Sequence, residues 1–494
     1  MLIWVLATRR AVVQDHGMKM LDARQTLGTS SEYIGYWWLP SDPKSAVAGT
    51  LRYAPETGCT LELMGYVGDA QLDGPIARLD GASPAGDQIT LLQVVPTKNR
   101  YVQDTFPTIQ YTCAVALVGN YHPPDDLQFS KSVVRFEHLE QWAHVRHVHQ
   151  EHLQGRRGVS FTVEVGEHGE LCARAGYTVT AQSGFNASAD DRSIRLDAFT
   201  ALRIEPNEVR DLEWFIEETR ALRDLAALSI GLPQPLTSLR LYGGQREVAP
   251  ALSATEEVFA YFWEETPARR SRGSYPLIAY QRLRTVAPDI LDRWKSVRDK
   301  YRDVIDLVLV VMSGHHTTSE VGFLLTMQAF EAFDRLRSPR ELVPQDVFEV
   351  ARQAMAAAIP SSAPTELRRK LSDSIKFANE PSLRQRLKAF HRRLSEELGE
   401  EPLGLGRPTI DRLVDTRNFY THYAEELRPA ILTPEGQADE TERFCALLIL
   451  SVLQEAGVPY AETLRGLDFH ERFRRYGRSY REGLLETARK LGDA

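Results

Sequence analysis

The amino-acid sequence changes character along its length, and this change constrains the fold more than any other feature. The first part of the chain contains short stretches of β-branched, aromatic and leucine residues, such as 60–64, 89–95 and 110–118, separated by Gly, Pro, Asp and Asn. This texture is typical of strands. After about Pro276 the chain predicts helices almost throughout, with prolines at most of their boundaries. We therefore expect an α+β protein in which a β-rich part precedes an all-α bundle.

Further strands are expected in the β-rich part. Residues 160–165 alternate polar and apolar side chains, and residues 169–180, 193–196 and 236–242 are also strand-like. Short, frequent strands favour a sandwich or a barrel, and the sequence does not choose between the two. Residues 208–230 have helical spacing and end at Gly and Pro, which is a helix stop signal.

The helical part divides into segments at its prolines. We expect a lead-in over residues 1–30, a β-rich N-terminal domain over 31–280 and a helical domain over 281–494. The expected helices of the last domain cover residues 288–312, 319–337, 344–358, 365–377, 382–398, 409–427, 441–456 and 469–491.

Charge and composition exclude several classes of protein. The chain has 59 basic and 67 acidic residues, a net charge of −8, so it is not a histone-like coat for nucleic acid. It contains no run of 18 apolar residues, and its N-terminal apolar run precedes its arginines, so neither a membrane span nor a secretory signal is expected. The four cysteines form no CxxC pair, which disfavours a disulfide framework or a zinc ribbon and favours the cytoplasm.

One expected helix carries polar residues where a bundle helix would present leucine. Ile410, Leu413 and Val414 form an apolar stripe, and the next positions on that stripe are Arg417 and Asn418. A charge that is buried or faces a groove needs a partner. A polar patch of this kind is a candidate site.

His422 extends this patch. It follows Asn418 by four residues, about 40° round a helix, so these two side chains are expected to touch. It lies about 140° from Arg417, so the arginine and the histidine do not stack directly. An arginine, an amide and a histidine suit phosphodiester chemistry, because histidine moves protons near neutral pH and arginine holds phosphate. A second stripe of Tyr420, Tyr423 and Leu427 is expected to pack on neighbouring helices.

The sequence of this segment resembles the motif of a known family. LVDTRNFYTHY (413–423) is similar to the R-x4–6-H signature of the HEPN superfamily, with a polar residue directly after the arginine. It is closest to the ApeA-like branch, a group of anti-phage abortive-infection proteins. Residues 35–65 resemble the opening of the N-terminal domain of that group, and FLLTMQAFEAFDRL (323–336) resembles its early HEPN helix.

The resemblance implies a function. HEPN ribonucleases need no metal or other cofactor, and they form homodimers in which two motifs face each other. The RNA 2′-hydroxyl attacks the adjacent phosphate and leaves a 2′,3′-cyclic phosphate. Carried onto this chain, His422 transfers protons, Arg417 stabilises the charge on phosphorus, and Asn418 positions the neighbouring group. The expected target is host RNA, with tRNA the leading candidate, and the N-terminal domain is expected to sense a phage-derived trigger.

Two basic segments of the helical part are candidates for RNA contacts. Residues 384–393 and 469–481 combine arginine, which holds phosphates, with Phe and Tyr, which stack on bases. The arginines expected to contact RNA are Arg384, Arg386, Arg474, Arg475 and Arg478.

Alternatives remain open. The helical domain could be a catalytically silent HEPN module that only dimerises or binds RNA. Residues 137–152 carry five histidines, for which we favour a solvated helix or linker, and a metal hydrolase built on them is the third hypothesis. These histidines are His138, His144, His147, His149 and His152. The adjacent pair His315 and His316 lies in a loop-like stretch and is expected to have no function.

Overall fold

The computed structural model divides the chain into two compact units, and each is described by itself. One unit comprises Met1–Ile216 and Leu236–Glu265, and the other comprises Glu217–Pro235 and Thr266–Ala494. The expected lead-in lies largely outside the described residues. Those residues are 25–68, 74–100, 107–143, 148–152, 159–163, 166–174, 176–189, 194–249, 252–264, 275–315, 318–398 and 405–475.

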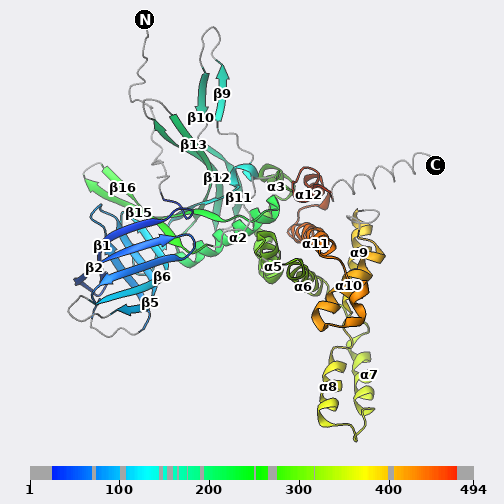
Figure 1. The fold of residues 1–494 in the computed structure, drawn as a ribbon. Helices are drawn as coiled ribbons and strands as arrows, with labels where there is room; N and C mark the ends of the chain where they lie inside the picture. Colours follow the sequence, from blue (N-terminus) through cyan, green and yellow to red (C-terminus); the bar gives the residue numbers. More distant parts are fainter. Residues whose placement is uncertain are drawn as a thin grey trace. The chain divides into compact units, whose positions relative to one another are not determined.

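Six antiparallel strands of the first unit close into a barrel, which Figure 1 shows in blue. Their order is β6-β3-β2-β1-β4-β5, and β5 pairs with β6 to close the ring. Closure removes the free edges that an open sheet would leave. Of the two expected architectures, the structure therefore has the barrel. The strands are β1 (Ser31–Leu39), β2 (Asp42–Ala54), β3 (Gly58–Met64), β4 (Ile76–Ala82), β5 (Gln88–Arg100) and β6 (Thr108–Gly119).

Large apolar side chains fill the barrel, and Trp37 is the largest of them. Its side chain is fully buried, and it lies against Gly81 of the neighbouring strand β4. A β-carbon placed on Gly81 would lie 2.3 Å from the Trp37 ring, so only glycine fits there. Leu61 and Leu91 complete the same core from strands β3 and β5.

Strand β6 also belongs to a second, open sheet. One of its edges pairs with β3 through residues 108–113 and with β16 through residues 115–119. The open sheet continues in the order β16-β15-β8-β13-β12-β11. Its further strands are β8 (Lys131–Phe136), β11 (Gly166–Arg174), β12 (Tyr177–Ala189), β13 (Ile194–Pro206), β15 (Leu236–Ala249) and β16 (Leu252–Phe262).

Smaller elements complete this unit. Strands β7 (Gln128–Phe129) and β14 (Arg210–Asp211) form one short ladder, and β9 (Val148–His152) and β10 (Val159–Val163) form another. The strand expected over residues 169–180 is in fact two strands. They turn at Gly176, whose φ of 116° is a conformation that favours glycine.

The second unit is helical, and α6 lies at its centre. Helix α6 packs against α5, α9, α10 and α11, which agrees with its apolar sequence. The helices are α3 (Tyr280–Val286), α4 (Ile290–Lys300), α5 (Arg302–Ser313), α6 (Ser319–Arg337), α7 (Gln345–Ala357), α8 (Thr365–Lys376), α9 (Leu383–Leu398), α10 (Arg407–His422), the short 3-10 helix η2 (Glu425–Ala430), α11 (Pro434–Glu455) and α12 (Tyr460–Leu467).

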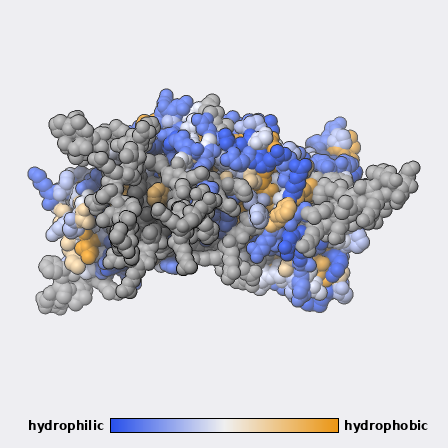
Figure 2. Space-filling view, turned by 90° about the horizontal axis from the view of Figure 1, so that it is seen from above, coloured by the Kyte–Doolittle hydropathy of each residue, from blue (hydrophilic) through white to orange (hydrophobic). Residues whose placement is uncertain are grey.

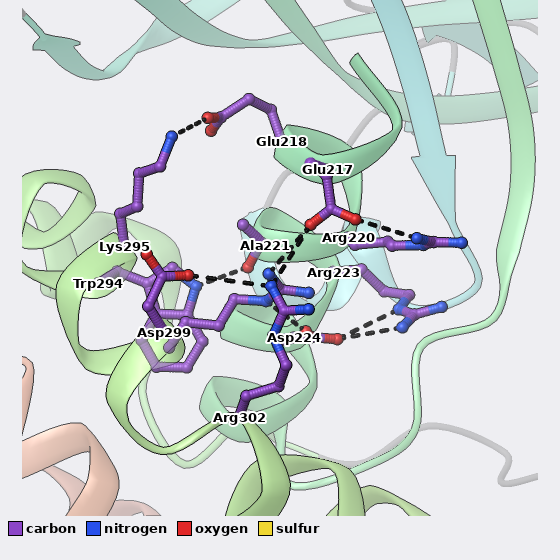
Figure 3. A network of polar contacts seen from close by, with 11 residues as sticks. Glu217, Glu218, Arg220, Ala221, Arg223, Asp224, Trp294, Lys295, Asp299 and Arg302 are labelled. Atoms are coloured by element: carbon purple, nitrogen blue, oxygen red, sulfur yellow. Dashed lines mark hydrogen bonds and ion pairs between the residues drawn. The ribbon is translucent and has the colours of Figure 1, made fainter. Parts of the chain in front are cut away.

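Most of helix α2 (Leu212–Ile230) groups with this helical unit, although its sequence lies within the expected 31–280 domain. Figure 3 shows the polar contacts that hold it to α4. The buried carboxylate of Asp224 lies 2.8 Å from the Arg298 guanidinium. The Trp294 indole donates a hydrogen bond of 2.6 Å to the Ala221 carbonyl. A buried ion pair and a buried indole partner make this contact specific.

The helices differ from expectation at several places. Helices α3 and α12 form where none was expected, α2 begins at Leu212, and most of the helix expected over 469–491 lies outside the described residues. The segment 288–312 forms two helices, because Tyr301 leaves helical geometry while its buried ring packs on Phe333 at 5.2 Å. Helix α11 begins at Pro434, earlier than expected, with Thr433 accepting a capping hydrogen bond. Helix α10 ends at His422 instead of continuing to residue 427.

Helices α7 and α8 form an arm that extends from the other helices of the unit (Figure 1). Asn379 fastens its base, since the side chain bonds both the N–H and the carbonyl of Val343. Among the described residues, no helix combines the length and apolar character that crossing a bilayer requires. On the face shown in Figure 2, the described surface is mostly hydrophilic with small hydrophobic patches.

Candidate active site

The first half of helix α10 is anchored in the helical core. Ile410, Leu413 and Val414 are buried, as the apolar stripe predicts. Thr416 is buried one turn further on, where its hydroxyl accepts a hydrogen bond of 2.9 Å from the Leu432 N–H. These contacts fix the helix on which the candidate residues lie.

Arg417 follows this anchored stretch and has the carboxylate partner that a partly buried charge requires. Its Nη2 lies 3.0 Å from Oε1 of Glu331 on α6. The Arg417 side chain is 30% exposed and that of Glu331 is 20% exposed, so the pair lies at the edge of the core. Sequence reasoning missed Glu331, although a lone carboxylate within the apolar FLLTMQAFEAF segment was a signal.

Asn418 contacts Arg417 and does not contact His422 as expected. Its Oδ1 accepts a hydrogen bond of 3.4 Å from Arg417 Nη1. The guanidinium is a charged donor, and charged donors form the stronger hydrogen bonds to an amide oxygen. In the part of the chain that the structure describes, His422 makes no hydrogen bond or ion pair.

His422 is exposed at the last position of α10. The helix ends there because Tyr423 adopts a left-handed conformation with φ of 52°, and its N–H bonds the Phe419 carbonyl at 2.6 Å. The expected second packing stripe therefore does not form. Tyr420 bonds the buried Gln437 amide, whereas Tyr423 is 71% exposed.

This arrangement places two candidate groups near the C-terminal end of helix α10. The paired guanidinium of Arg417 lies at the core edge, and the imidazole of His422 is exposed one turn later. Together they offer a fixed positive charge and a proton-transfer group.

Two family models match the chain. The model "ApeA N-terminal domain 1" matches residues 32–297, more than half of the 494-residue chain. The model "Apea-like HEPN" matches residues 324–462, which include Glu331, Arg417 and His422. The chain is an ApeA-like HEPN protein. This family serves in anti-phage defence, as the resemblance of the motif implies. No curated protein and no solved structure matches the chain.

The candidate RNA-contacting arginines of this ApeA-like protein have different surroundings. Arg386 has a side chain that is 4% exposed, and it lies 3.0 Å from Asp334, so the structure gives it a packing role in place of the expected RNA contact. Arg384 joins α9 to α10 by pairing with Asp411 and Asp415. Arg475 pairs with Asp439 at 2.6 Å, Arg474 is exposed, and Arg478 lies outside the described residues.

The histidine-rich segment of the ApeA-like protein is not one helix. Helix α1 (Leu139–Ala143) is short. The buried His138 precedes it in the sequence, and His149 lies on strand β9. His144 and His147 lie outside the described residues. Within the described ranges, no three His, Cys, Asp or Glu side chains are grouped so as to hold a metal ion. His316 is also outside those ranges, and Ser313 Oγ lies 2.8 Å from His315 Nδ1.

Proposed function

We propose that this ApeA-like HEPN protein is an endoribonuclease that cleaves host RNA, with tRNA the leading candidate. The observation that carries the proposal is the placement of Arg417 and His422 at the open end of one anchored helix. Both residues lie within the range that matches the HEPN model. Their side chains are the types that phosphodiester cleavage needs.

The proposed step is an internal transfer on RNA. A base takes the proton of the 2′-hydroxyl, and the 2′-oxygen forms a bond to the adjacent phosphorus. The bond from phosphorus to the 5′-oxygen breaks, and that oxygen receives a proton. The products are a 2′,3′-cyclic phosphate and a 5′-hydroxyl, and no metal ion or external oxidant takes part.

Each residue has a role in this step. His422 transfers the proton, because imidazole exchanges protons near neutral pH. Arg417 stabilises the charge that gathers on the phosphoryl oxygens. Asn418 positions that guanidinium, a role supported by its bond to Arg417 Nη1.

The step needs both a base and an acid, whereas one chain supplies one histidine of the motif. We therefore propose that two copies pair through the HEPN unit so that a two-fold axis supplies both groups. The β-rich N-terminal part would restrain the nuclease until a phage-derived trigger arrives. A strictly monomeric protein that cleaves RNA efficiently would contradict this pairing.

Two substitutions test the proposal. His422→Ala and Arg417→Ala should each reduce RNA cleavage and host toxicity by roughly 10²-fold or more without unfolding the protein. His315→Ala is a matched control, since it removes a histidine of the same unit that we place outside the site. Variants at 417 and 422 that remain as toxic as the parent would refute the nuclease.

The products and the metal requirement give a second test. Sequencing of RNA ends from cells that express the intact protein should find 5′-hydroxyl ends opposite 2′,3′-cyclic phosphates. Cleavage should persist in excess chelator, whereas loss of cleavage there would favour the metal hydrolase.

The contact between Arg417 and Glu331 favours a second candidate, a silent HEPN module. A guanidinium already neutralised by a carboxylate has less charge to offer a phosphate. Under this alternative the chain dimerises or binds RNA, and neither His422→Ala nor Arg417→Ala changes the RNA of the host.

A further inference from the structure

Tyr423 occupies a backbone position that a tyrosine does not favour. Its φ of 52° lies in the left-handed region, where glycine or asparagine normally ends a helix. Either of those residues would supply the same N–H to the Phe419 carbonyl and end α10 at the same place. The termination of the helix therefore does not explain the aromatic ring.

The packing of the protein does not explain the ring either. Tyr423 is 71% exposed, and its ring centroid lies 6.1 Å from that of the buried Phe419. The Arg428 guanidinium lies over the same Phe419 ring at 4.8 Å, and its side chain is 60% exposed. Tyr423 thus borders Phe419 with an exposed aromatic ring, and Arg428 borders it with a guanidinium plane whose edge pairs with Glu425. We call Phe419, Tyr423 and Arg428 the ring platform.

The ring platform adjoins the proposed proton-transfer group. Tyr423 follows His422 directly, so their Cα atoms are about 3.8 Å apart. Attack by a 2′-hydroxyl requires the ribose and phosphate to leave A-form geometry, which unstacks a neighbouring base. Exposed aromatic rings and guanidinium planes hold such unstacked bases.

We propose that Tyr423 binds the base next to the cleaved phosphate by stacking, and so positions single-stranded RNA on His422. The inference rests on the proposed ribonuclease function and adds the residue that selects unpaired RNA. Helical RNA, whose bases are already stacked, would not engage the ring. Tyr423 is a positioning residue and takes no part in the proton transfers.

Binding measurements on the full chain test this role. In the His422→Ala background, Tyr423→Asn should weaken binding of a labelled RNA hairpin by roughly tenfold, measured by fluorescence anisotropy. Tyr423→Phe and Tyr423→Trp should bind like the parent, since both keep the ring. The midpoint temperature of thermal unfolding should be the same in Tyr423→Asn as in the parent or higher, because asparagine suits the left-handed conformation.

Hairpins with an abasic ribose at each loop position in turn identify the stacked base. One such hairpin should bind the parent as weakly as the intact hairpin binds Tyr423→Asn. Combining that hairpin with Tyr423→Asn should weaken binding no further, because both changes remove the same stacking contact. Phe377→Asn is the matched control, because it removes a ring that is 65% exposed elsewhere on the helical unit.

The outcomes separate this inference from the proposed function. Equal affinity of Tyr423→Asn and the parent for every hairpin overturns the stacking role and leaves the nuclease standing. A parent chain that neither binds nor cleaves any RNA overturns both.

Discussion

The guanidinium of Arg417 and the carboxylate of Glu331 join helices α10 and α6, with Nη2 3.0 Å from Oε1. The pair also leaves Arg417 Nη1 to the Asn418 amide. Two partners therefore hold the guanidinium in one orientation. We interpret Glu331 as the residue that aims Arg417.

Substitution of Glu331 tests this interpretation. Glu331→Gln should slow RNA cleavage by roughly tenfold, because the guanidinium loses its charged support but keeps the amide. The free energy of unfolding should change by less than about 1 kcal/mol, since both side chains are partly exposed. Single-turnover cleavage and chemical denaturation measure the two effects. Faster cleavage by the variant would mean that Glu331 masks Arg417 instead.

Acid should destabilise the helical unit through His470. Burial lowers the pKa of His470 to about 4, and its ring is neutral, with Nε2 donating to the Ile230 carbonyl at 2.9 Å. Between its ordinary value of 6.5 and about 4, the unfolded chain binds a proton that the native chain does not. Stability from this group is therefore complete above pH 6.5 and falls by roughly 3 kcal/mol as the pH approaches 4.

Denaturation curves at several pH values measure this effect. In His470→Gln, whose amide can still donate to Ile230, the slope of stability against pH between 4 and 6.5 should be smaller than in the parent. Identical slopes for the two proteins would show that His470 does not carry the effect.

The buried ion pair of α2 should matter more than an exposed one. Asp224→Ala should destabilise the helical unit by about 3 kcal/mol, because the Arg298 guanidinium, 11% exposed, loses its nearest carboxylate and keeps the more distant Glu217 at 3.5 Å. Asp373→Ala removes a carboxylate from an exposed pair with Lys376 and should change the unfolding midpoint far less. Equal unfolding midpoints for the two variants would contradict the role of α2.

Overpacking of the barrel gives another test. Gly81→Ala should destabilise the protein by about 1–3 kcal/mol, because the new methyl group meets the Trp37 ring. Gly74→Ala is the control, since nothing lies within 4 Å of its added carbon. A loss of near-ultraviolet circular dichroism in Gly81→Ala alone would report the displaced indole.

The sequence predicted helices and strands well where residues within the same segment determine their boundaries. The helix over residues 319–337 has the boundaries of α6, because Thr318 caps it and its apolar spacing is regular. The order of a β-rich part followed by helices is confirmed, and so is the ApeA-like family. The sequence did not predict whether the strands form a barrel or a sandwich. That outcome depends on the pairing of β5 with β6, and spacing within one strand does not reveal the partner strand.

The candidate site shows the same division. Spacing on one helix placed Arg417 beyond the buried stripe of Ile410 and Leu413. Spacing could not supply Glu331, which comes from a different helix, nor the end of α10 at His422, which no glycine or proline marks. Spacing also could not show that Arg386 turns inward, because its partner Asp334 lies on a different helix.

The pairing of strand β6 determines where the N-terminal part of the protein can be truncated without exposing a strand edge. Its single outer edge is divided between β3 and β16, so a fragment that stops before β16 bares residues 115–119 on one side. Bare strand edges recruit strands from other molecules. Fragments prepared for expression or crystallisation should therefore carry the chain at least through Phe262, and shorter ones should aggregate.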